Sequence, residues 1–142
     1  MNKQEFIKRL NDFYTKYNID PKDCYVSHGG SMLMLGLAET TNDIDLSVTW
    51  EVYNRFAGDP DYLITLIPPL GSADAWELIK VTDYIDIHPI RESGIDESVL
   101  FEENNVRYRN MKATLEDYLV FNRPKDQPRI RKLLRYLKVV DG

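Results

Sequence analysis

The sequence predicts a mixed α/β (α+β) fold in which helices flank a small mixed β-sheet. Near both ends of the chain, apolar residues recur every three or four positions, as on the buried side of a helix. Between them, short runs alternate apolar and polar residues and are separated by turn residues, as in strands. The order helix, strand, helix, strand, then further strands and two helices favours one mixed domain over residues 1–142.

The first half of the chain is expected to alternate helices with strands. An apolar stripe predicts the first helix and consists of Phe6, Leu10, Phe13, Tyr14 and Tyr17. A Gly-Gly-Ser turn then separates a strand from a short helix, and the next strand has the sequence DIDLSV. The expected elements are a helix over 3–17, a strand over 24–27, a helix over 32–38, a strand over 43–48 and a helix over 51–57.

The second half is expected to add strands and then two helices. Asn104-Asn105 predicts a hairpin turn, and Thr114 with Asp117 resembles a capping box at a helix start. The final helix follows the RPKDQP segment and is basic. The expected elements are strands over 62–67, 76–81 and 82–90, a hairpin over 100–111, a helix over 115–121 and a helix from about 129 to 138.

Composition excludes several classes of protein. The chain is 43% hydrophobic and 29% charged, as expected for a packed globular protein rather than a disordered one. Cys24 is the only cysteine, so no intrachain disulfide can form and no cysteine-based zinc site is indicated. No apolar run approaches the length of a membrane span, and the amphipathic N-terminus does not match a signal peptide. We therefore expect a cytoplasmic protein that does not contact a membrane.

Positive charge is concentrated near the C-terminus. Between Arg107 and Lys138 there are ten Lys/Arg and three Asp/Glu, although the net charge of the chain is −5. The last helix can bind RNA through its basic residues, or it can be a surface helix whose leucines pack inward. Arg107 and Arg109 share a face of the hairpin, where solvation on an edge strand is the simpler interpretation and phosphate binding the alternative.

Two strands carry carboxylates on a face opposite their apolar residues. In DIDLSV, Asp43 and Asp45 alternate with Ile44 and Leu46, so the two carboxylates point the same way. In the run YIDIHP, Asp86 has the same relation to the isoleucines around it. Neighbouring carboxylates repel each other, and oxygen ligands spaced in this way suit a divalent cation such as Mg²⁺. Solvated aspartates on an exposed face are the alternative.

A glycine-rich turn precedes this strand. Gly29, Gly30 and Ser31 stand where a strand passes into a helix, where a backbone without side chains can approach a phosphate. His28, directly before them, is a structural residue, a phosphate contact or a base, and His88, which shares the face of Asp86, is a second functional candidate.

The string HGGSMLMLGLAETTNDIDLSV resembles the signature of the nucleotidyltransferase superfamily, of the minimal polymerase-beta-like kind. In that signature Gly-Gly or Gly-Ser is followed, after about ten residues, by Asp-hydrophobic-Asp-hydrophobic; here eleven residues separate Ser31 from Asp43. The run TLEDYLVFNRPKDQPRIRKLL also resembles the end of a bacterial and phage branch related to abortive-infection toxin nucleotidyltransferases.

The resemblance implies a nucleotidyltransferase fold and a role for each matching residue. Gly30, Ser31 and Lys125 would hold the nucleotide, with Gly29 shaping the turn. The metal ligands and catalytic residues would be Asp43, Asp45 and Asp86, the last also acting as base. The implied reaction is the Mg²⁺-dependent transfer of NMP from an NTP, ATP first, to a hydroxyl of a protein, a tRNA or a small molecule, in a toxin-antitoxin or phage-defence setting.

Two departures from that branch define an alternative function. Glu39 stands where a basic residue is expected, and Phe121-Asn122 stand where relatives often place a lysine. Both changes remove positive charge near the expected triphosphate. The alternative is therefore a catalytically silent nucleotidyltransferase fold that acts as an antitoxin or phage accessory protein and binds a protein or RNA.

Overall fold

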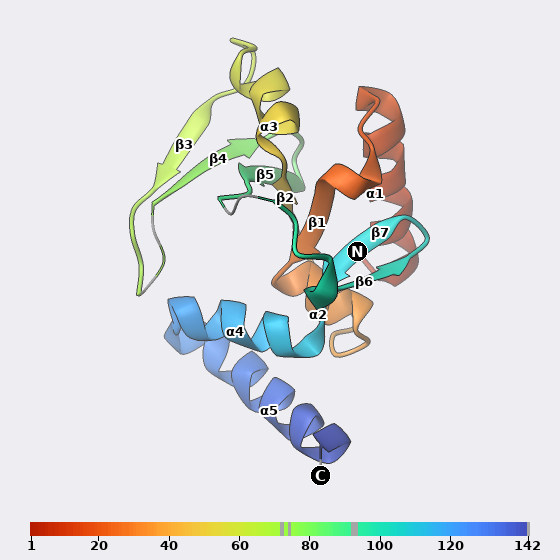
Figure 1. Cartoon of the computed structure of the whole chain (residues 1–142), viewed down its shortest axis with the longest axis vertical. Helices are drawn as coiled ribbons and strands as arrows, with labels where there is room; N and C mark the ends of the chain where they lie inside the picture. The colour runs from red at the N-terminus through yellow and green to blue at the C-terminus, as the bar shows by residue number, and fades with distance from the viewer. Residues whose placement is uncertain (72, 74, 92–93, 142) are drawn as a thin grey trace.

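The computed structural model of the chain describes residues 1–71, 73, 75–91 and 94–141. The mixed sheet has the order β3-β4-β5-β2-β1-β7-β6, which confirms the expected α/β class (Figure 1). The helices of the described residues are α1 (Lys3–Tyr17), α2 (Gly29–Met34), α3 (Trp50–Ala57), α4 (Met111–Phe121) and α5 (Gln127–Asp141), with short 3-10 turns η1 (Pro21–Asp23), η2 (Glu97–Val99) and η3 (Pro124–Asp126). The strands are β1 (Cys24–Ser27), β2 (Ile44–Val48), β3 (Ile64–Ile67), β4 (Trp76–Lys80), β5 (Ile85–Pro89), β6 (Leu100–Glu103) and β7 (Val106–Arg109).

Helix α1 forms where its apolar stripe predicts. Asn2 and Glu5 make a reciprocal capping box at its start, and Asn18 ends it in the left-handed conformation. Phe6 and Leu10 on its inner face are completely buried, together with the apolar face of the sheet and residues of α3. Burial of one such side chain contributes roughly 1.5–3 kcal/mol, so this interface is a main source of stability.

Strand β2 lies at the centre of the sheet and alternates between its two faces. Ile44, Leu46 and Val48 are fully buried on the side that α1 and α3 cover. Strand β2 pairs with β1 in antiparallel and with β5 in parallel orientation. The polar residues of β2 and β5 therefore share the opposite face, as their alternation predicts.

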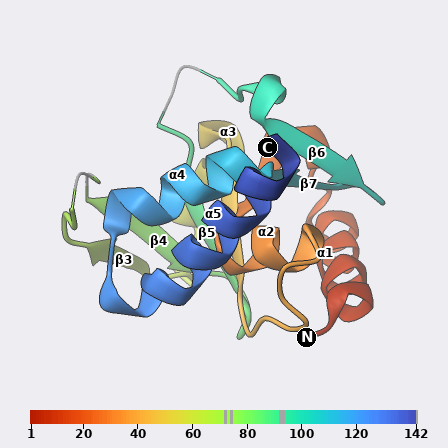
Figure 2. The same cartoon turned by 90° about the horizontal axis from the view of Figure 1, so that it is seen from below.

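Helices α4 and α5 lie together against α2, at the lower end of the molecule in Figure 1 and in front of the sheet in Figure 2. A second core joins the three helices and consists of Met32, Leu37, Leu115, Tyr118, Ile130 and Leu133. This core fixes the η3 turn between α4 and α5 relative to the sheet. In the described residues, no helix has the length and apolar character needed to cross a membrane.

The predicted hairpin is confirmed, but its second strand is not at an edge. Asn104 and Asn105 both have positive φ, as a two-residue turn between twisted strands requires. Strand β7 pairs with β6 and also in parallel with β1, so the edge-strand interpretation of Arg107 and Arg109 is wrong. The Arg107 side chain is buried, donates to the Lys22 carbonyl and pairs with Glu97.

Several predicted boundaries are corrected by local hydrogen bonds. Helix α4 begins at Met111 because the Asn110 side chain accepts from the Ala113 N–H, so the predicted Thr114 and Asp117 capping box is wrong. Thr114 instead donates to the Asn110 carbonyl. Turns shorten three predicted strands, which form as Ile64–Ile67, Trp76–Lys80 and Ile85–Pro89. Helix α2 starts at Gly29 rather than residue 32, and α5 starts at Gln127.

Candidate functional site

The site is built on a pair of aspartates at the centre of the sheet. Asp45 on β2 and Asp86 on β5 are direct partners in the parallel register. Adjacent strands are about 4.8 Å apart, so the two carboxylates project from neighbouring positions on one face. Asp43 stands just before β2 and is exposed. The Nζ of Lys80 on β4 lies 3.9 Å from an oxygen of Asp86.

The three carboxylates influence one another electrostatically. Burial first, and then the nearby charges of Asp86 and Asp43, together raise the pKa of Asp45 to about 6, against the opposing effect of Arg123 and Lys125. Burial also raises the pKa of Asp86, with Lys80 opposing and Asp43 adding to the effect. Asp45 and Asp86 are therefore harder to ionise than an exposed aspartate.

A cavity of about 350 Å³ opens beside these aspartates, and we call it the carboxylate pocket. Asp43 and Asp45 form its acidic side. Its basic side comes from the η3 turn and the start of α5, and its remaining wall is aromatic. The basic residues are Arg123, Lys125 and Arg129, and the aromatic ones are His28, Trp76, Tyr118 and Phe121.

A clamp within the η3 turn holds the basic side in place. The side chain of Asp126 is completely buried and accepts hydrogen bonds from the backbone N–H and the guanidinium of Arg123. Burial alone would raise the pKa of Asp126, but the bonds from Arg123 outweigh it and leave the pKa below its usual value. Lys125, between the two, is exposed and lines the pocket.

Of the glycine-rich turn, only Gly29 lines the carboxylate pocket. Gly30 is buried, and a Cβ at this position would lie 2.4 Å from Val26 Cγ1 and 2.7 Å from Phe6 Cζ. The Ser31 hydroxyl is also buried and donates to the Val26 carbonyl. The structure thus places Asp43, Asp45, Gly29 and Lys125 around one cavity, with Asp86 beside Asp45, and places Gly30 and Ser31 in the packing beneath it.

No protein-family model matches the chain, and no curated protein matches it in sequence. Solved structures with a similar fold do exist. The structure of ANT(2″)-Ia in complex with adenylyl-2″-tobramycin matches with a TM-score of 0.57 at 15% identity, over 94% of this chain and 90% of that one. A Thermotoga maritima protein to which nucleotidyltransferase activity is attributed matches with a TM-score of 0.55 at 14% identity, over 96% of both chains. The chain has the nucleotidyltransferase fold.

The Megavirus polyadenylate synthase shares this fold over part of its length. It matches with a TM-score of 0.57 at 13% identity, over 94% of this chain but only 33% of the synthase. The chain therefore corresponds to about one third of that protein. Each of these identities is low, so the likeness establishes the nucleotidyltransferase fold and leaves activity to be argued from the site.

The carboxylates of this nucleotidyltransferase fold suit a divalent cation. Asp43, Asp45 and Asp86 offer hard carboxylate oxygens, and the charges of Asp86 and Asp43 add to the effect of burial in raising the pKa of Asp45. A bound cation would offset those charges. Within the part of the chain that the structure describes, no group of three or more His, Cys, Asp or Glu side chains is already gathered closely enough to hold a metal. A cation here would thus be completed by substrate or water oxygens.

The aromatic wall is the part of the site that the sequence does not reveal. Trp76 comes from β4, and Tyr118 and Phe121 come from α4, so no local motif connects them. The ring of His28 makes edge contacts to Tyr118 and Trp76, with centroids 5.3 Å and 6.2 Å away. His28 Nε2 and Tyr118 Oη are both buried without a hydrogen-bond partner. Buried polar atoms usually have a partner, and a ligand in the adjoining cavity would supply the one that the protein does not.

Proposed function

We propose that this chain is a Mg²⁺-dependent nucleotidyltransferase that moves NMP from an NTP, ATP first, to an acceptor hydroxyl. One observation carries the proposal: the register that sets Asp45 beside Asp86, at a cavity whose opposite side is Arg123, Lys125 and Arg129. Two solved structures of similar fold support this class of reaction. One was solved with an adenylylated tobramycin and another is a polyadenylate synthase.

The two sides of the carboxylate pocket suit the two charges of a metal nucleotide. The basic side, with Lys125 exposed at its rim, would receive the triphosphate. Asp43 and Asp45 on the acidic side, together with Asp86 beside Asp45, would hold Mg²⁺. When bound, Mg²⁺ would neutralise charge that develops on the phosphate oxygens. At Gly29 there is no side chain to keep the phosphates away from the backbone.

The reaction is a displacement at the α-phosphorus. The acceptor oxygen forms a bond to the α-phosphorus. The bond between the α-phosphorus and the oxygen that bridges it to the β-phosphate breaks, and pyrophosphate leaves. The acceptor proton passes to Asp86, our choice of base. Burial raises the pKa of this carboxyl above its usual value and makes it a better proton acceptor.

Label transfer tests the function. The wild type would be incubated with α-³²P-labelled ATP, GTP, CTP or UTP, Mg²⁺ and a cell extract separated into small-molecule, RNA and protein fractions. We expect one fraction to become labelled, and labelling to be lost in Asp45→Asn. No labelled acceptor with any nucleotide, or equal labelling by Asp45→Asn, would favour the silent binding module instead.

The biological setting belongs to the same proposal. NTPs and Mg²⁺ are abundant in the cytoplasm, where we place the protein. A toxin-antitoxin or phage-defence role predicts that expression slows bacterial growth or protects against phage, and that Asp45→Asn abolishes the effect. An equal effect of the wild type and Asp45→Asn would separate the phenotype from nucleotide transfer.

A further inference from the structure

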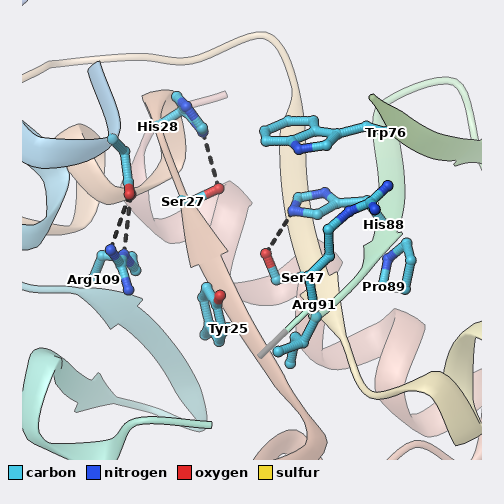
Figure 3. Close-up of a pocket in the computed structure, with 11 residues that line it drawn as sticks. Tyr25, Ser27, His28, Ser47, Trp76, His88, Pro89, Arg91 and Arg109 are labelled. Carbon is cyan, nitrogen blue, oxygen red and sulfur yellow. Dashed lines mark hydrogen bonds and ion pairs between the residues drawn. The ribbon is translucent and has the colours of Figure 1, made fainter. Parts of the chain in front are cut away.

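A second cavity of about 160 Å³ adjoins the carboxylate pocket (Figure 3). His28 and Trp76 line both cavities, so these two side chains mark their common border. We call the second cavity the serine-histidine pocket, after Ser27, His28, Ser47 and His88 in its lining. The proposed reaction assigns no role to it.

The serine-histidine pocket lies on the same sheet face as the aspartates. Ser47 and His88 are paired in the β2–β5 register two residues beyond Asp45 and Asp86, which is about 6.6 Å along the strands. On the other side of β2, Ser27 pairs with Asp45 in the register. Asp86 is two residues before His88 on β5 and is the neighbouring residue on this face. A molecule bound against Ser47 and His88 therefore lies next to Asp86.

The lining offers hydrogen-bond donors and acceptors together with one flat aromatic surface. Hydroxyl groups come from Tyr25, Ser27 and Ser47. The indole of Trp76 stacks on the ring of His88 with centroids 4.6 Å apart and planes inclined by 7°. The ring of His88 is buried, and its Nε2 lies 2.7 Å from the hydroxyl oxygen of Ser47.

Charge in this pocket is mixed rather than of one sign. The guanidinium of Arg109 makes two hydrogen bonds to the Asp117 carboxylate at 2.9 and 3.0 Å. Arg91 lines the pocket beside His88 (Figure 3) and donates to the Ala75 carbonyl. Hydroxyl, imidazole, guanidinium and carboxylate groups around an aromatic ring suit a neutral molecule with many hydroxyls better than a polyanion.

His28 is held in a way that packing alone does not explain. Its Nδ1 lies 3.0 Å from Ser27 Oγ, but its Nε2 is buried without a partner. Its backbone has φ 56° and ψ −124°, which is costly for a residue with a side chain. An unpartnered nitrogen kept in a strained position at the border of two cavities is well placed to contact a ligand that spans them.

The volume limits the size of the ligand. A cavity of about 150 Å³ holds one benzene molecule, so the serine-histidine pocket accommodates about one six-membered ring. A nucleic acid end or a folded protein segment would have to remain outside it.

We propose that the serine-histidine pocket is the acceptor site, and that the acceptor is a small polyhydroxylated compound of about one sugar ring. This rests on the proposed transferase function and specifies its substrate class. The acceptor ring lies against Trp76, and one of its hydroxyls faces Asp86. That oxygen bonds to the α-phosphorus, its proton goes to Asp86, and pyrophosphate leaves.

Ligand-observed NMR tests the site without requiring turnover. Saturation transfer from the protein to D-glucose, D-galactose, D-ribose and myo-inositol would be measured with Mg²⁺ and a non-hydrolysable ATP analogue present. We expect transfer to at least one of these probes. Saturation transfer should fall about ten-fold in Ser47→Val, which narrows the cavity. It should fall several-fold in Arg91→Ala, at the exposed rim. Arg135→Ala, on the exposed side of α5, is the control and should match the wild type.

The outcomes separate this proposal from the function on which it rests. Calorimetry should show unchanged binding of the ATP analogue in Ser47→Val and Arg91→Ala. If the wild type bound a polyol but no nucleotide, the transferase function would fail while the ligand class of the pocket stood. Three results would overturn the acceptor proposal. They are no saturation transfer to any probe, saturation transfer in both pocket variants equal to that in the wild type, and α-³²P label on RNA or protein.

Discussion

Asp45 and Asp86 are direct partners on the parallel strands β2 and β5, with Asp43 close enough to affect both. The sheet therefore brings together carboxylates that lie 41 positions apart in the sequence. This relationship has consequences for stability as well as for the proposed chemistry, because folding buries Asp45 and brings it close to Asp86 and Asp43, and both effects oppose its ionisation.

Asp45→Asn should stabilise the protein at neutral pH in the presence of EDTA. Its pKa is about 6 in the folded state and about 3.9 when unfolded, so the folded state binds the proton more tightly. The contribution of protonated Asp45 to the free energy of unfolding is fully present below pH 4 and is lost as pH rises through 6. The difference is at most about 3 kcal/mol, at roughly 1.4 kcal/mol per pKa unit.

Urea denaturation at pH values from 4.5 to 7.5 measures this effect. The wild type should lose stability relative to Asp45→Asn across that range, and Mg²⁺ at pH 7.5 should stabilise the wild type more than the variant. Parallel pH profiles for the two proteins would show that folding does not raise the pKa of Asp45.

Gly30→Ala should destabilise the protein by about 1–3 kcal/mol, because the new Cβ overlaps Val26 and Phe6 in the core. Thermal unfolding gives the comparison. Gly94→Ala is the matched control, since nothing lies within 4 Å of a Cβ at that position. A Gly30→Ala protein as stable as Gly94→Ala would mean that packing does not require glycine at residue 30.

Asp126→Asn should cost about 1.5–3 kcal/mol of stability, since it weakens the charged hydrogen bonds from Arg123 in a buried site. The pKa of Asp126 lies below its usual value, so this stability is present near neutral pH and is lost on acidification. Chemical denaturation at pH 7 tests it. Lys125→Ala, in the same turn but exposed, should change stability by no more than about 0.5 kcal/mol while weakening ATP binding. If Lys125→Ala lost more stability than Asp126→Asn, the role of Asp126 in holding the η3 turn would be contradicted.

Two adjacent leucines test the packing of α5. Leu133 is completely buried against α2 and α4, whereas Leu134 is 50% exposed. We expect Leu133→Ala to cost about 2–5 kcal/mol. The loss from Leu134→Ala should be under about 1 kcal/mol, as measured by urea denaturation. Similar losses at both positions would place the helix in a different rotation about its axis.

Local pattern predicts much of this fold, because helix α1 and the alternating strands β2 and β5 depend on periodicity within each segment. The shared face of Asp45 and Asp86 follows from the same periodicity. The burial of Arg107 does not, since it depends on β7 pairing with β1, a partner some eighty residues away in the sequence. The inward turn of Ser31 and the aromatic wall of Trp76, Tyr118 and Phe121 likewise depend on tertiary contacts that no single segment encodes.

The central claim is that the carboxylate pocket binds a metal nucleotide, and calorimetric titration of ATP tests it most directly. The wild type and Asp45→Asn would each be titrated in Mg²⁺ and in EDTA. We predict that the wild type binds ATP with Mg²⁺, and that affinity falls at least ten-fold in EDTA and in Asp45→Asn. Equal ATP affinity in all four titrations, or no ATP binding by the wild type in Mg²⁺, would contradict the claim.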